Sequence, residues 1–186
     1  MPVSRFPVVE LEDLPGDLRD RVGAIAEKSG FLPNIFRALG HRPAELRAFL
    51  DYHDALMDRS EGLSKAEREL VVVATSGANH CTYCVVAHGA ILRIRAKDPE
   101  LADRVSSNPW QVELDRRGRA IVELALALAR DSHLFGERHV EAAREAGLTE
   151  DEIWDIGAIT ALFAMSNRLA HFTALRPNPE FYGMGR

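Results

Sequence analysis

The chain has very little cysteine, since its 186 residues contain only Cys81 and Cys84. Two thiols cannot build the multi-disulfide framework of a small secreted protein. Residues 1–5, Met-Pro-Val-Ser-Arg, also lack the apolar core that a secretory signal peptide needs. These absences predict a cytoplasmic protein, in which a Cys-x-x-Cys pair serves catalysis or metal binding more often than structure.

Long apolar runs, excess positive charge and strand-like alternation are missing as well. The longest apolar run, about residues 156–165, is too short to cross a bilayer. A formal net charge of -5 and a pI near 5.8 argue against binding to a phosphate backbone. No stretch alternates apolar and polar residues for long enough to make a strand. We therefore expect an all-α fold with no membrane and no nucleic-acid partner.

Length and composition indicate one globular unit. The hydrophobic and charged fractions, 46% and 27%, are ordinary for a soluble protein, and the chain is long enough for a sizeable core. We predict a single domain over residues 1–186, with residues 1–15 as an extended arm and residues 176–186 as an irregular aromatic tail docked on a surface. Helical periodicity predicts helices over 16–29, 34–39, 43–56, 64–77, 81–95, 115–130 and 136–146, and a long one from 148 onward.

Two helix starts resemble each other. Residues 62–67, Gly-Leu-Ser-Lys-Ala-Glu, recur at an offset of 85 as residues 147–152, Gly-Leu-Thr-Glu-Asp-Glu, and both are capping boxes. At this offset Cys81 falls on Ser166. One interpretation is a multi-helix bundle with a degenerate internal duplication, in which only the first copy carries thiols. The other is that two common helix starts arose independently.

The densest chemistry lies around the two cysteines. Cys81, Cys84 and His88 stand at i, i+3 and i+7, so a helix places them on one face. A helix starting near Cys81 would favour a thiolate through its free N–H groups and dipole. His88 could take the proton of Cys84, and Glu69 on the preceding helix could orient that histidine.

Simpler explanations exist for each of these residues. Buried cysteines can be ordinary core, although this does not explain the neighbouring histidine. A zinc site of His80, Cys81, Cys84 and His88 is disfavoured, because four ligands on one helical stretch cannot easily surround a tetrahedral ion. Glu69 could be a charge on a solvated helix face, while Glu67 already has a role in its capping box. The remaining histidines lack a motif, although His53 lies on an apolar face with Phe49 and could line a pocket.

The motif of Glu69, Cys81, Cys84 and His88 resembles the signature of the alkylhydroperoxidase D-like proteins, within the carboxymuconolactone decarboxylase superfamily. Further segments, 30–38, 76–84, 166–170 and 177–182, look like the uncharacterised peroxidase-related branch, so the resemblance covers almost the whole chain. It implies an all-helical fold and a homodimer or higher homo-oligomer. It also implies a peroxidase that reduces hydrogen peroxide or alkyl hydroperoxides without haem, flavin or metal.

Carried over by position, the resemblance makes Cys84 the peroxide-attacking thiolate and Cys81 the resolving thiol. Glu69 and His88 would form the proton relay that activates Cys84. An external dithiol protein, lipoyl- or thioredoxin-like, would restore the pair. Apolar residues near the site, Phe31, Phe36 and Phe49, would favour an alkyl hydroperoxide. One departure is that well-characterised relatives have a histidine at the position of Tyr83, whose phenol, with an ordinary pKa of about 10, cannot be a base at neutral pH.

Other functions remain open at this point. A general thiol–disulfide oxidoreductase or redox sensor would use the same two cysteines without a peroxide pocket. A decarboxylase or lactone-type enzyme of the superfamily would not need them, because those members lack the Cys-x-x-Cys. A non-enzymatic interaction protein would leave the whole group of residues unexplained.

Overall fold

The computed structural model describes residues 2–186, which form nine α-helices and no strand. The predicted all-α fold is thus confirmed. In chain order the helices are α1 (Gly16–Ser29), α2 (Asn34–Leu39), α3 (Pro43–Met57), α4 (Lys65–Ala78), α5 (Thr82–Ala96), α6 (Leu101–Ser107), α7 (Arg116–Arg130), α8 (Glu137–Glu145) and α9 (Glu150–Thr173).

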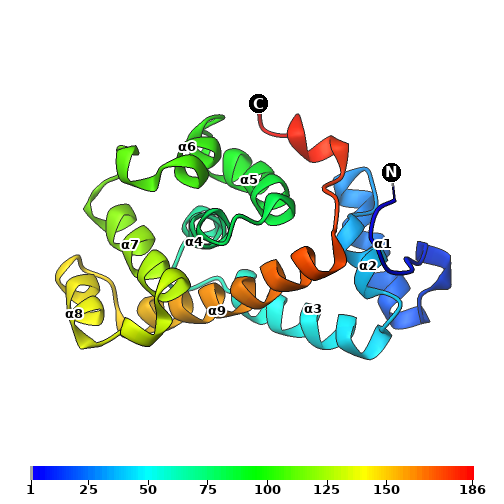
Figure 1. Cartoon of the computed structure of the whole chain (residues 1–186), viewed down its shortest axis with the longest axis horizontal. Helices are drawn as coiled ribbons and strands as arrows, with labels where there is room; N and C mark the ends of the chain where they lie inside the picture. Colours follow the sequence, from blue (N-terminus) through cyan, green and yellow to red (C-terminus); the bar gives the residue numbers. More distant parts are fainter. Residues whose placement is uncertain (1) are drawn as a thin grey trace.

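Helix α4 is the centre of the molecule. Figure 1 shows it end-on, with α5, α6, α7 and α9 arranged around it, and each of these helices packs against it. Every residue from 68 to 76 is buried, because α4 has neighbours on all sides. Its approach to α6 is so close that a Cβ on Gly77 would lie 3.0 Å from the backbone of Ser106, so a glycine is required there.

Helix α6 is the element that periodicity did not predict. It has only seven residues and lies between Pro99 and Pro109. Its start depends on a local cap, since the Asp98 carboxylate accepts hydrogen bonds from the backbone N–H groups of Glu100 and Leu101 at 2.9 and 3.0 Å. Such a short helix has too few turns to show a convincing apolar stripe.

Both predicted capping boxes are confirmed, at Ser64 and Glu67 for α4 and at Thr149 and Glu152 for α9. A single guanidinium joins them, because Arg117 donates to Glu67 and to Glu152 at 2.6 Å each. The hydroxyl groups of Thr75 and Thr160, which also differ by 85 positions, lie 3.5 Å apart. These contacts between equivalent positions support the duplication, but α9 runs through 24 residues without the break that separates α4 from α5.

The N-terminal arm meets the start of the C-terminal tail, since the backbone N–H of Arg176 donates to the carbonyl of Val3 at 3.0 Å. In the arm, the Ser4 hydroxyl donates to the carbonyl of Thr173 at 3.0 Å. In the tail, the buried Arg93 guanidinium donates to the carbonyls of Phe181 and Met184 at 2.9 Å each. The expected docking of the tail is confirmed, although both ends are more regular than predicted, with 3₁₀ turns at Leu11–Asp13 and Pro179–Tyr182.

A buried ion pair ties α4 to α9. Arg68 and Asp155 are 0% and 1% exposed at their side chains, and their charged atoms lie 2.9 Å apart. Arg68 also donates to the carbonyl of Leu56 at 2.7 Å, and the partly exposed Arg59 contacts Asp155 at 3.1 Å. The buried charge of Asp155 is therefore paired with two guanidinium groups.

We expect Asp155→Asn to lower the free energy of unfolding by about 3–5 kcal/mol, because Arg68 would keep its buried charge without a counter-ion. Urea unfolding followed by circular dichroism measures this loss. Asp20→Asn, at an exposed position of α1, is the matched control and should change stability by less than about 0.5 kcal/mol. Equal stability of the two variants would contradict the prediction.

Candidate active site

The turn between α4 and α5 positions the two cysteines. Helix α4 ends at Ala78, and His80 adopts a left-handed conformation with φ of 54°. The chain then reverses so that the backbone N–H of Cys81 donates to the carbonyl of Ser76 at 2.9 Å. Cys81 is the N-cap of α5 and Cys84 lies in its first turn, which confirms the predicted break and helix start.

The two thiols are free and buried, with exposures of 1% and 2%, and they interact with each other. A hydrogen bond from the Cys84 side chain lowers the pKa of Cys81 to about 6, against the opposing effect of burial, and the backbone N–H of Cys84 adds to this. The same side-chain hydrogen bond, together with burial, raises the pKa of Cys84. The lowered pKa of the pair therefore belongs to Cys81 and the raised one to Cys84.

Glu69 and His88 are in direct contact. The Oε2 of Glu69 lies 2.8 Å from the Nδ1 of His88, which joins α4 to α5 through largely buried side chains. A carboxylate at this position accepts the Nδ1 proton, so Nε2 is the nitrogen left for other partners. The ring of His88 packs edge-on against Phe163 of α9, with centroids 4.6 Å apart. Among residues 2–186, no hydrogen bond links His88 to Cys84 directly.

A cavity of about 490 Å³ brings these groups together. Cys84, Glu69 and His88 line it, whereas Cys81 does not. Side chains from α1, α2, α3, α9 and the tail complete a mostly apolar wall. Two of the three phenylalanines expected to surround the site, Phe36 and Phe49, are among them. Phe31 does not itself line the cavity, but its ring packs edge-on against Phe181, which does, with centroids 4.8 Å apart.

Tyr83 has a structural role between the two cysteines. Its hydroxyl oxygen accepts a hydrogen bond from the backbone N–H of Ile35 at 3.0 Å, which fixes the first turn of α2 against α5. Burial raises the pKa of this phenol further above its ordinary value. Tyr83 is therefore unsuited to act as a base. Its hydroxyl instead holds the first turn of α2 against α5.

Several site residues have no motif that marks them in the sequence. Ser166 and Asn167 of α9 form hydrogen bonds with Cys84 that lower its pKa, without overcoming the effects that raise it. Asn167 is itself fixed by a hydrogen bond to the Ser76 hydroxyl at 3.1 Å and by one from Asn79 at 3.0 Å. The only signals in the sequence were the correspondence of Ser166 with Cys81 at the offset of 85 and the place of both residues in a family-like segment.

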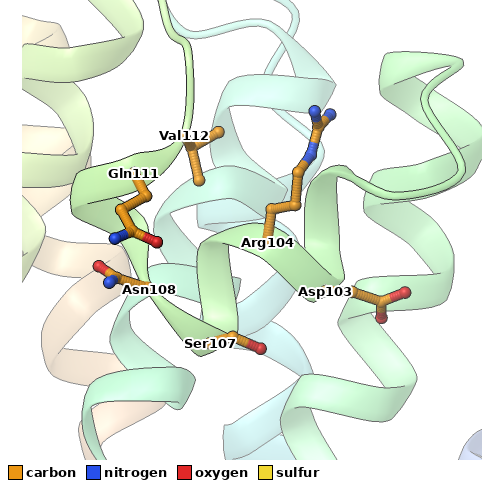
Figure 2. A pocket seen from close by; sticks show the side chains of 6 residues that line it. All are labelled: Asp103, Arg104, Ser107, Asn108, Gln111 and Val112. Atoms are coloured by element: carbon orange, nitrogen blue, oxygen red, sulfur yellow. The ribbon is translucent and has the colours of Figure 1, made fainter.

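A second hollow, of about 420 Å³, lies at α6 and the turn that follows it (Figure 2). Its lining contains neither a thiol nor an imidazole, so it offers none of the chemistry of the cysteine cavity. The residues around it are Asp103, Arg104, Ser107, Asn108, Gln111 and Val112.

The described residues contain no group of three or more histidine, cysteine, aspartate or glutamate side chains that could hold a metal ion. The four residues weighed for zinc are thus not gathered into a site. Within residues 2–186, no helix is both long enough and apolar enough to span a bilayer.

Comparisons with known proteins agree with this geometry. The carboxymuconolactone decarboxylase family matches residues 43–106, which include α4, α5 and their connecting turn. A search of curated proteins found no match. A crystal structure from Ralstonia eutropha JMP134, described as an alkylhydroperoxidase AhpD core and an uncharacterised peroxidase-related protein, is 53% identical, with 100% of this chain and 98% of that chain covered and a TM-score of 0.97.

A second uncharacterised peroxidase-related protein, from Silicibacter sp. TM1040, is 35% identical over 100% of both chains, with a TM-score of 0.91. The debrominase Bmp8, crystallised with 2,3,4-tribromopyrrole, is only 17% identical, covers 96% of this chain and 94% of its own, and has a TM-score of 0.81. That likeness shows a shared fold alone. The fold therefore occurs in proteins with more than one kind of chemistry.

We expect Tyr83→Phe to lower the free energy of unfolding by about 1–3 kcal/mol, because the N–H of Ile35 would lose its acceptor. Urea unfolding measures the change. Tyr52→Phe, at a tyrosine that is 49% exposed, should have little effect. Loss of the same size in both variants would show that the hydrogen bond to Ile35 is not the cause.

We expect Cys84→Ala to raise the pKa of Cys81 above about 6, because the thiolate would lose its strongest hydrogen-bond donor. The ultraviolet absorbance of thiolate against pH measures this value. The wild-type protein should gain one thiolate around pH 6 and the second only in alkaline solution. A Cys84→Ala protein that still titrates at or below the wild-type pKa would contradict this explanation.

Proposed function

The chain belongs to the carboxymuconolactone decarboxylase family, among its alkylhydroperoxidase D-like, peroxidase-related members, and from this we propose that it is a thiol-dependent peroxidase. The observation that carries the proposal is the position of Cys84 on the wall of a cavity that it shares with the hydrogen-bonded Glu69–His88 pair. The same cavity is thus lined by a nucleophile, Cys84, by a base, His88, and by the carboxylate that would orient the base, Glu69.

In the proposed reaction, the Cys84 thiolate attacks the terminal oxygen of a hydroperoxide. The S–O bond forms as the O–O bond breaks, and Cys84 becomes a sulfenic acid. His88 would accept the thiol proton, with Glu69 stabilising the imidazolium. Since no direct hydrogen bond joins His88 to Cys84, the proton would pass through a water molecule or the peroxide itself, for which the cavity has room.

The second half of the cycle would use Cys81. Its thiolate, at the start of α5 and hydrogen-bonded to Cys84, would attack the sulfenic sulfur. As the disulfide forms, the S–O bond would break and the displaced hydroxide would take a proton from solvent to leave as water. An external dithiol, lipoyl- or thioredoxin-like, would then reduce the disulfide by exchange. The apolar lining, with Phe36, Phe49 and Phe163, favours an alkyl hydroperoxide over hydrogen peroxide.

One observation favours a second candidate, a general thiol–disulfide oxidoreductase. The cysteine with the lowered pKa is Cys81, the N-terminal member of the pair, while the pKa of Cys84 is raised. In this alternative Cys81 would attack a protein disulfide and Cys84 would resolve it. Access argues against it, because Cys81 does not line the cavity and is only 1% exposed.

Stopped-flow mixing of the reduced protein with cumene hydroperoxide separates the two candidates. We expect loss of both thiols in the wild type and no reaction in Cys84→Ser. Cys81→Ser should accumulate a sulfenic acid that dimedone traps. Trapping in Cys84→Ser instead would reverse the roles, and slow peroxide reaction with fast exchange against protein disulfides would favour the oxidoreductase.

Glu69→Gln should slow the peroxide reaction by about tenfold to a hundredfold, because the neutral amide stabilises an imidazolium less well. Glu61→Gln, at an exposed loop position, is the control and should react like the wild type. A Glu69→Gln protein with the wild-type rate would remove Glu69 from the mechanism while leaving the thiol chemistry in place.

A further inference from the structure

A second carboxylate–imidazole pair lines the same cavity. His53 and Asp54 lie on α3, and the Nδ1 of His53 is 3.0 Å from the Oδ1 of Asp54. The other oxygen of this carboxylate accepts a hydrogen bond from Arg21 at 2.7 Å. The hydrogen bond to His53, followed by the one to Arg21, lowers the pKa of Asp54 to about 2. Asp54 is thus an ionised partner for the Nδ1 proton of His53 across the physiological range.

Aromatic packing fixes the ring of His53 next to that of His88. Phe49 stacks on His53 with centroids 6.1 Å apart, and Phe163 meets it edge-on at 6.3 Å. Phe163 also contacts His88, and the centroids of the two imidazoles are 6.5 Å apart. Each imidazole is thus held at Nδ1 by its own carboxylate, which leaves two Nε2 atoms for the cavity.

The peroxide reaction contains a second proton transfer, besides the one from the thiol to His88. When the thiolate breaks the O–O bond of an alkyl hydroperoxide, the leaving alkoxide is a strong base and needs a proton. His88 at that moment holds the proton taken from the thiol. Tyr83 is a poor donor, because its phenol is buried with a raised pKa and its oxygen is engaged by Ile35. His53, a second imidazole at the cavity, offers a separate donor, so that one ring takes the thiol proton while the other protonates the alkoxide.

We propose that His53 is the general acid that protonates the leaving alkoxide, an inference that rests on the proposed peroxidase function. The S–O bond forms at Cys84, the O–O bond breaks, and the alkoxide takes the Nε2 proton of the His53 imidazolium to leave as an alcohol. The thiol proton goes to His88 and on to solvent. His53, with a side chain that is 28% exposed, regains its proton from solvent. In sum, a thiol and a hydroperoxide give a sulfenic acid and an alcohol.

The sensitivity of the rate to the leaving group tests this role. tert-Butyl hydroperoxide releases a strongly basic alkoxide that needs a proton, whereas peracetic acid releases acetate, which does not. We expect His53→Gln to react with tert-butyl hydroperoxide at least about a hundredfold more slowly than the wild type, and with peracetic acid within about twofold. Single-turnover loss of the Cys84 thiol, followed by stopped flow, gives both rate constants.

Two further variants sharpen the test. His133→Gln, at an exposed histidine far from the motif, should match the wild type with both oxidants. Asp54→Asn, which changes the residue that positions His53, should show a smaller loss with the same preference for peracetic acid. Thermal melting of each variant checks that the protein is folded.

Each remaining outcome has a definite meaning. An equal loss of rate with both oxidants would overturn the proposal, since it would indicate a role in packing or binding, and so would an unchanged rate with tert-butyl hydroperoxide. If the wild-type Cys84 reacted with neither oxidant, the peroxidase function itself would be wrong. A reactive wild type with an unaffected His53→Gln variant would overturn only the role of His53.

Discussion

The burial of α4 on every side is the constraint on which the rest of the structure depends. Two charged residues, Arg68 and Glu69, follow each other on this helix and both are buried. Neither charge can be left without a partner inside the protein. Arg68 finds its partner in Asp155 of α9, and Glu69 finds its partner in His88 of α5. One contact ties α4 to α9 and the other holds an imidazole at the cavity, so a buried ion pair and the proposed catalytic pair come from adjacent positions of one helix.

The cysteine with the lower pKa and the cysteine that lines the cavity are different residues. Cys81 is the N-cap of α5 and carries the lower pKa, but it lies away from the cavity. Cys84 faces the cavity and holds the shared proton. In the proposed cycle, the cysteine that lines the cavity therefore stays a neutral thiol until a base removes its proton. The thiolate that resolves the sulfenic acid is meanwhile ready beside it, which would shorten the life of an intermediate that is easily over-oxidised.

Much of the fold could be predicted because its signals are local. Capping boxes at Ser64 and Thr149 mark two helix starts, and the break before Cys81 follows from the residues around it. The sequence could suggest that Glu69 orients His88, and the family resemblance agreed, but whether the two side chains meet depends on how two helices cross. His53 was expected to line a pocket because it shares an apolar helix face with Phe49, and it does. Ser166 reaches the cavity, and Asn167 reaches Cys84, through the tertiary packing of α9, which periodicity does not encode. The direction of each thiol pKa likewise depends on which sulfur donates the hydrogen bond, and this requires coordinates.

Arg117 joins the capping boxes of α4 and α9, and both of these helices contribute to the cavity lining, α4 through Glu69 and α9 through Phe163. One guanidinium therefore links the two helices at their first turns, away from the cysteines. If the first turn of either helix unfolded, Arg117 would lose one of its two carboxylate partners. The link between the two helices would then be lost. Two helices that line the cavity are thus held at their starts by one residue that does not itself line it.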